Sequence, residues 1–263
     1  MPTLSLNRPD ITEMIGRMAQ AMQQTTGLPD SESPARQDSP DLRALARIMD
    51  HTLLRPQATS DDLDRFCREA VSLHVGAISI HQVWVPLAVR ILRGTGIKVG
   101  TVVGFPFGAI YPSIKRVEAE ASIRAGATEL DMVMNIGAMR SGNLEGVYSD
   151  IQGVASIAHD SGCILKVILE NAYLSDEQKV MACRLAKQAG ADYVKTSTGL
   201  GPSGATESDV RLMRKAVGTE MGVKAAGGIR TLADAVSMLQ AGSDRLGTST
   251  SAAILAEAAR RVG

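Results

Sequence analysis

The sequence predicts an α/β protein, a (β/α)8 TIM barrel with a short N-terminal helical extension, and three observations support this fold class. The chain has 263 residues, the usual length of one such barrel. From Leu42 onward, short runs rich in Val and Ile alternate with longer helical stretches, as parallel strands with right-handed crossovers require. Eight such runs are present, and the first lacks the Gly-rich fingerprint that often follows the first strand of an open dinucleotide-binding sheet.

Residues 1–40 differ from the rest of the chain, and we expect an extension and linker there, followed by the barrel domain at 41–263. A linker is predicted by QQTTGLPDSESPARQDSP, which is rich in polar residues and proline. The sequence leaves open whether the preceding helix docks on its own barrel, is loosely ordered or contacts another subunit. Its apolar stripe, at helical spacing, consists of Ile11, Met14, Ile15, Met18 and Met22.

The barrel elements follow in order from the apolar runs. Helical stretches between the runs tend to open at Ser, Thr or Asp and to close at Gly, as helix ends prefer. Clear examples are 60–73, 112–126, 176–190 and 231–242. The strand candidates are 48–52, 77–81, 98–103, 129–134, 164–169, 192–196, 222–226 and 244–248.

Composition and charge argue against several classes of function. Lys plus Arg and Asp plus Glu both number 28, so there is no electrostatic basis for a nucleic-acid partner. The three cysteines are widely spaced and odd in number, which argues against a disulfide framework, and the four histidines lack metal-site spacing. No apolar run is long enough to span a bilayer and the N-terminus does not resemble a signal peptide, so we expect no membrane partner and a cytoplasmic location.

Charged side chains inside the strand candidates are the most informative residues. Asp131, Lys166, Lys195 and Lys224 lie on four consecutive strands, although lysine is almost never fully buried without a partner. The three lysines are 29 positions apart in each case, which is one strand–helix unit. We therefore expect them at the same mouth of the barrel, at the carboxyl ends of the strands, where such barrels place catalysis.

Two interpretations of this cluster compete. The structural one is a buried ion-pair network, or lysines that point outward beneath helices. The catalytic one is amine chemistry, because a lysine surrounded by other lysines has a lowered pKa and supplies free amine near neutral pH. That amine forms an imine with a carbonyl, which makes the adjacent C–C bond breakable, while Asp131 moves protons directly or through a water. These arguments leave open which lysine is the nucleophile.

Two segments after the last two strands favour a phosphate site. AAGGIRT contains a glycine pair, and GTSTS opens a helix. Adjacent glycines let backbone N–H groups approach an anion, and a helix N-terminus adds a favourable dipole. Barrels often bind phosphate at these two loops, although tight turns use glycine pairs equally often. The segment from Thr196 to Gly199 would form a third side of this phosphate site.

With these segments in view, the chain resembles the deoxyribose-phosphate aldolase family from about Ala46 to Leu255. KTSTG followed by VKxxGGIRT is highly specific as a pair. The segments that carry the resemblance are DHTLL (50–54), VVGFPFGA (102–109), ELDMVMNIGA (129–138), ILKVILE (164–170), DYVKTSTG (192–199), VKAAGGIRT (223–231) and RLGTST (245–250).

The resemblance implies a reaction and a set of roles. The reaction is reversible cleavage of 2-deoxy-D-ribose 5-phosphate to D-glyceraldehyde 3-phosphate and acetaldehyde, with no metal or organic cofactor, in a homodimer or homotetramer. Lys195 would form the Schiff base, Lys224 would lower its pKa, Asp131 would relay protons and Lys166 would support the network. Substrate contacts would come from Asp50 and Thr52, and phosphate contacts from Gly199, Gly227, Gly228, Gly247, Ser249 and Thr250, the last standing where serine is usual.

Three stretches depart from the family pattern and bear on substrate range. They are Ser79–Gln82 on the second strand, Ile110–Ser113 after the third and Glu170–Tyr173 after the fifth. One alternative is therefore a Schiff-base aldolase of the same fold for another aldehyde or sugar phosphate. A less favoured one is a non-catalytic barrel that binds a phosphorylated metabolite, which would have no need for an amine with a lowered pKa.

Overall fold

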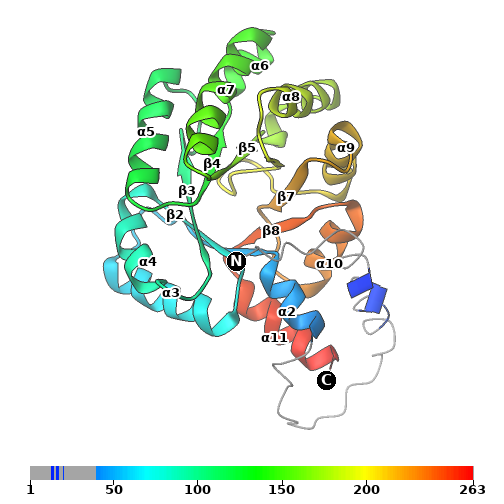
Figure 1. The fold of residues 1–263 in the computed structure, drawn as a ribbon. Coiled ribbons are helices and arrows are strands. Elements are labelled where there is room, and N and C mark those ends of the chain that lie inside the picture. The colour runs from blue at the N-terminus through cyan, green and yellow to red at the C-terminus, as the bar shows by residue number, and fades with distance from the viewer. Residues whose placement is uncertain (1–12, 15, 18–19, 21–39, 263) are drawn as a thin grey trace.

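The computed structural model describes residues 13–14, 16–17, 20 and 40–262. Eight parallel strands form a closed barrel in chain order, with β1 hydrogen-bonded to both β2 and β8, and helices surround it (Figure 1). The predicted fold class is therefore confirmed. The strands are β1 (Met49–Leu53), β2 (Ala77–Ile80), β3 (Lys98–Val103), β4 (Glu129–Val133), β5 (Ile164–Ile168), β6 (Tyr193–Lys195), β7 (Gly222–Ala226) and β8 (Arg245–Thr248).

The helices begin and end where the sequence signals them. Thr59, Ser175 and Thr231 each close a capping box at the start of a helix, and Gly242 ends one in the left-handed region at φ 113°. The helices are α2 (Pro40–Arg47), α3 (Ser60–Leu73), α4 (Val85–Ile91), α5 (Pro112–Arg124), α6 (Ile136–Arg140), α7 (Leu144–Asp160), α8 (Asp176–Gln188), α9 (Glu207–Val217), α10 (Leu232–Ala241) and α11 (Ser251–Val262), with short 3-10 turns at Gln82–Trp84 and Asn171–Tyr173. Among the described helices, none is long and apolar enough to cross a membrane.

Part of the predicted N-terminal helix falls within the described residues. Met14 is fully buried and belongs to the hydrophobic core, and Arg17 Nε donates to Asp41 Oδ2 of α2 at 2.7 Å. α2 in turn packs against α11 (Figure 1). The remaining residues of the predicted apolar stripe (Ile11, Ile15, Met18 and Met22) lie outside the described residues, as does the linker up to residue 39, while its last residue, Pro40, begins α2.

Strand register sets the level of each charged side chain inside the barrel. Lys195 lies directly opposite Lys224 on the neighbouring strand, so these two are level. Lys166 lies opposite Tyr193, two residues before Lys195, and is therefore one layer deeper in the barrel. The expectation that even spacing brings all three lysines to the mouth is wrong for Lys166, because the strands are staggered around the barrel, and Lys224, although level with Lys195, is fully buried as well.

Candidate active site

A cluster of seven ionisable side chains fills the barrel interior within the described part of the chain. All lie on strands and all are buried or nearly so, which rules out lysines that point outward beneath helices. The cluster is an ion-pair network, as one interpretation of the sequence proposed. The cations are Lys166, Lys195, Lys224 and Arg245, and the anions are Asp50, Glu129 and Asp131.

Asp131 on β4 is the centre of the cluster. Its Oδ2 accepts hydrogen bonds from Lys195 Nζ at 2.8 Å and Lys224 Nζ at 2.7 Å, and its Oδ1 accepts one from Lys166 Nζ at 2.8 Å. Burial alone would raise the pKa of this carboxyl, but the three lysines hold it well below its usual value. Asp131 is therefore ionised and fixes three amines around itself.

The deeper part of the cluster holds the remaining partners. Lys166 donates to Glu129 at 2.6 Å, and Arg245 contacts both Glu129 at 3.0 Å and Asp50 at 2.9 Å. Lys224 also donates to Asp50. Against the effect of burial, Asp131, Glu129 and Asp50 raise the pKa of Lys166, so this lysine stays a cation.

Lys195 is the member of the cluster that is easiest to deprotonate. Burial, followed by the positive charges of Lys224 and Lys166, lowers its pKa to about 8 despite the opposing effect of Asp131. Charge balance points the same way, because four cations face three carboxylates when Lys195 is protonated and three face three when it is neutral. A fraction of free amine is therefore available near neutral pH.

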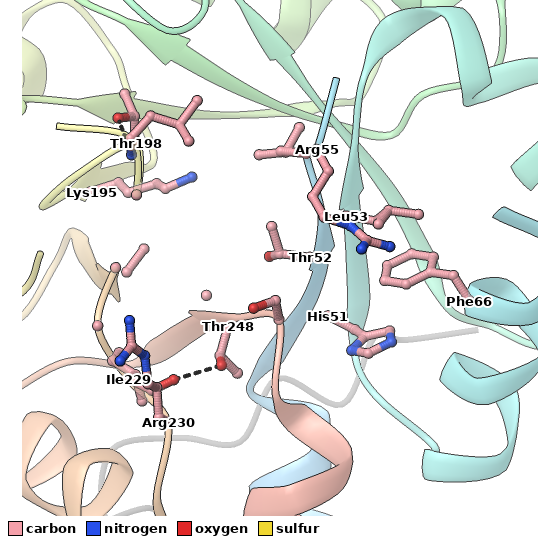
Figure 2. Close-up of a pocket in the computed structure, with 18 of the residues that line it drawn as sticks. His51, Thr52, Leu53, Arg55, Phe66, Lys195, Thr198, Ile229, Arg230 and Thr248 are labelled. Carbon is pink, nitrogen blue, oxygen red and sulfur yellow. Dashed lines mark hydrogen bonds between the residues drawn. The ribbon is translucent and has the colours of Figure 1, made fainter. Parts of the chain in front are cut away.

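A cavity of about 690 Å³ opens above the cluster at the carboxyl ends of the strands. Figure 2 shows Lys195 extending its amine into this space, with Thr52 of β1 across from it. Of the seven clustered residues, all within the described chain, Lys195 alone lines the cavity. Asp50, expected as a substrate contact, lies below the cavity beside Lys224 and Arg245, whereas Thr52 lines it.

Five of the six predicted phosphate contacts line one side of the same cavity. Thr250 does not line it, because its hydroxyl turns away toward Thr248 at 3.0 Å and toward the Ile229 carbonyl at 3.3 Å. Thr248 donates to that carbonyl at 2.7 Å, which joins the loop after β7 to the end of β8 (Figure 2). The five predicted phosphate contacts that line the cavity are Gly199, Gly227, Gly228, Gly247 and Ser249.

Sequence reasoning did not single out several residues of the site. Glu129 lies two positions before Asp131, so strand alternation places both on the inner face, and this signal was available. Arg245 is the first residue of β8, and in the sequence it is only a charged residue at the end of a strand, with no sign of a role in the site. Arg55 and Arg230 line the cavity on opposite sides, and Arg230 lies two positions after Gly228 of the glycine pair (Figure 2).

Comparisons with known proteins agree with this geometry. Residues 44–256 match the model of a family described as DeoC/LacD family aldolase. Proteins named deoxyribose-phosphate aldolase from Methanothermobacter thermautotrophicus and Thermococcus gammatolerans are 53% and 49% identical over 212 and 213 residues, which is 80% of this chain and 93% and 95% of theirs. A solved structure described as a tetrameric deoxyribose phosphate aldolase from Aeropyrum pernix is 32% identical, covers 97% of both chains and superposes with a TM-score of 0.77.

Proposed function

Because the chain belongs to the DeoC/LacD family of aldolases and is therefore an enzyme of carbon–carbon bond chemistry, we propose that it is a deoxyribose-phosphate aldolase. The reaction is reversible cleavage of 2-deoxy-D-ribose 5-phosphate to D-glyceraldehyde 3-phosphate and acetaldehyde. The observation that carries the proposal is the position of Lys195, a buried amine with a lowered pKa that opens onto a cavity lined by phosphate-type glycine loops.

In the proposed mechanism, the free amine of Lys195 attacks C1 of the open-chain sugar, and loss of water gives a protonated imine. The C3 hydroxyl then loses its proton, the C2–C3 bond breaks and its electron pair moves into the enamine, which releases glyceraldehyde 3-phosphate. Protonation at C2 and addition of water to the imine release acetaldehyde and restore the amine. The water lost in the first step is thus recovered in the last.

The proposed roles of the other cluster residues rest on their contacts. Asp131 and Lys224 exchange protons with the reacting centre, directly or through a water, because Asp131 accepts a hydrogen bond from Lys195 and Lys224 donates to the same Asp131 oxygen. Lys166 holds the second oxygen of Asp131 and so fixes the orientation of that carboxylate. The 5-phosphate sits against the glycine loops after β6, β7 and β8, with Thr52 across the cavity as a contact for the sugar.

The stretches that depart from the family pattern lie away from the proposed substrate space. Within the described chain, neither the Ser79–Gln82 stretch nor the Ile110–Ser113 loop lines the main cavity, and Glu170 and Asn171 are buried behind the loop that carries Thr198. The cavity wall is built from the loops after β1, β6, β7 and β8 together with α3. This favours the phosphorylated pentose over another aldehyde as substrate.

Borohydride trapping tests the proposal. The enzyme is incubated with 2-deoxyribose 5-phosphate or acetaldehyde, reduced with borohydride and mapped by peptide mass spectrometry. A reduced adduct on the peptide that contains Lys195 is expected, with none on those that contain Lys166 or Lys224. An adduct on either of those would overturn the role of Lys195 and keep the class of reaction. No adduct with either compound would favour a different carbonyl substrate or the non-catalytic barrel.

We further propose that the enzyme works as a homodimer or homotetramer. Large apolar side chains are exposed on α5 and on the loop before it: Phe107 is 75% exposed, Tyr111 79% and Val117 55%, with Ile114 between them. Ile114 and Val117 lie three residues apart on α5 and so share one outward face, and Tyr111 is the N-cap residue directly before this helix. Light scattering tests this: a monomer at working concentration would contradict it, and Tyr111→Asp should shift an oligomer toward smaller species.

Two further proposals concern the N-terminal residues and the location of the protein in the cell. We propose that residues 1–40 are an N-terminal extension and linker and that residues 41–263 form the barrel domain. The burial of Met14 in the hydrophobic core and the Arg17–Asp41 ion pair support docking of the described part of the extension on that domain. We also propose a cytoplasmic location, supported by the cysteines of the described chain, which are all buried free thiols as a reducing compartment allows.

A further inference from the structure

Glu170, the second residue after β5, is a buried carboxylate that the proposed mechanism does not use. It is 2% exposed, and among the described residues no lysine, arginine or histidine forms an ion pair with it. Its backbone is left-handed at φ 53°, a conformation that costs a non-glycine residue free energy. A buried, unpaired carboxylate is also costly unless it is hydrogen-bonded. Two unfavourable features at one residue, directly behind a loop that lines the cavity, indicate a role in function.

The side-chain hydrogen bonds of Glu170 all lead to the loop that follows Lys195. Glu170 Oε2 accepts hydrogen bonds from both the backbone N–H of Thr198, at 3.1 Å, and its hydroxyl. The hydroxyl oxygen of Thr198 in turn accepts from the N–H of Leu200 at 3.0 Å. Gly199, between them, has φ 87° and lines the cavity. The carboxylate therefore orients the hydroxyl, and the hydroxyl closes a tight turn around Gly199.

The same loop is held so closely that its shape depends on this carboxylate. A Cβ at Gly201 would lie 2.9 Å from the Glu170 carboxyl, so the loop passes directly against it. On its other side the loop is fixed to the glycine pair after β7, since Ala205 N donates to Gly227 O at 2.9 Å. The loop is thus held between the Glu170 carboxylate on one side and the glycine pair on the other.

We propose that Glu170 is a positioning residue that sets the loop Thr198–Gly201 in the conformation that receives the substrate phosphate. It acts through Thr198, touches no reacting atom and determines affinity for phosphorylated substrates, with little effect on the chemistry at Lys195. This inference rests on the proposed function for its substrate. The structural basis is the chain of hydrogen bonds from the carboxylate through Thr198 to Leu200, with the cavity-lining Gly199 enclosed.

The test compares Glu170→Met, which removes the acceptor at similar volume, with Glu170→Gln, whose amide oxygen still accepts both hydrogen bonds. For 2-deoxyribose 5-phosphate, the methionine variant should raise KM at least about tenfold with kcat within about threefold, because two hydrogen bonds to a charged group are lost. The glutamine variant should restore KM to near normal. For 2-deoxyribose without phosphate, kcat/KM should be unchanged in both variants.

Controls separate positioning from stability and from the proposed function. Asp150→Asn alters a buried carboxylate of α7 that does not line the cavity and should lower Tm without changing KM. Thr198→Val removes the intermediate hydroxyl, so it should reproduce the KM effect even if Glu170→Met fails to fold. Equal losses for both sugars, or an unchanged KM in the methionine and valine variants, would overturn the inference.

Binding of inorganic phosphate, measured by calorimetry, provides a readout that does not depend on turnover. It should weaken at least about tenfold in Glu170→Met and stay near the wild-type value in Glu170→Gln. Absence of cleavage by the wild-type enzyme would refute the proposed function, while this phosphate measurement would still decide the role of Glu170. Equal phosphate affinity in all three proteins would refute that role.

Discussion

Replacing Lys224 by methionine removes a positive charge beside Lys195 while keeping a side chain of similar length. Lys195 Nζ and Lys224 Nζ contact the same Asp131 oxygen at 2.8 Å and 2.7 Å, so as two sides of a triangle these distances place the nitrogens at most about 5.5 Å apart. Two unit charges at that separation repel by about 3 kcal/mol at an effective dielectric constant of about 20.

That repulsion corresponds to about two pKa units. The pKa of Lys195, which burial and then Lys224 lower to about 8, should therefore rise toward about 10 in the variant. At pH 7 the free-amine fraction falls from about one part in ten to about one part in a thousand, so kcat/KM should drop about 100-fold. Because the lowered pKa favours the free amine, the loss should shrink as the pH rises.

The assay is the pH profile of kcat/KM for cleavage of 2-deoxyribose 5-phosphate, paired with borohydride trapping of Lys195 by acetaldehyde at each pH. The wild-type profile should rise through about pH 8, and that of Lys224→Met about two units higher. Lys224→Arg keeps the charge and is the matched control, with a midpoint near that of the wild type. A methionine variant that still turned over with a midpoint near pH 8 would show that Lys224 does not set the pKa of Lys195.

Three further predictions follow from the same geometry. Lys195→Met should lose cleavage at least about 1,000-fold and lose borohydride trapping, yet still bind inorganic phosphate in calorimetry; near-normal turnover would refute its assignment. The pKa of Asp131 is held below its ordinary value of about 4, so the stability it contributes is present above about pH 4 and lost as the pH falls below it. The Tm of Asp131→Asn should accordingly fall less steeply than that of the wild type between about pH 5 and pH 2. Gly204→Ala would place a Cβ 2.2 Å from Gly227 O, so thermal denaturation should show a loss of about 1–3 kcal/mol, whereas Gly137→Ala, with no neighbour closer than 3.6 Å, should show none.

Much of the fold could be predicted because its signals are local. Each strand is a short Val- and Ile-rich run, so all eight predicted strands coincide with observed ones to within one residue at each end. Capping residues such as Thr59 and Ser175 likewise signal helix starts in the sequence itself. The lysines inside strands and the glycine pair at Gly227 also indicated, without coordinates, where an amine and an anion site would lie.

The sequence by itself thus determined a barrel with charged residues at its core, and the tertiary structure decided what each charge does. Strand stagger places Lys166 one layer below Lys195, and the cavity opens above Lys195 alone among the clustered residues of the described chain. Closure of the barrel brings Asp50 of the first strand to Lys224 of the seventh, 174 positions away. Burial in this closed barrel, followed by the positive charges of Lys224 and Lys166, lowers the pKa of Lys195. A pKa depends on burial and on distances through space, and the spacing of residues along a chain determines neither quantity.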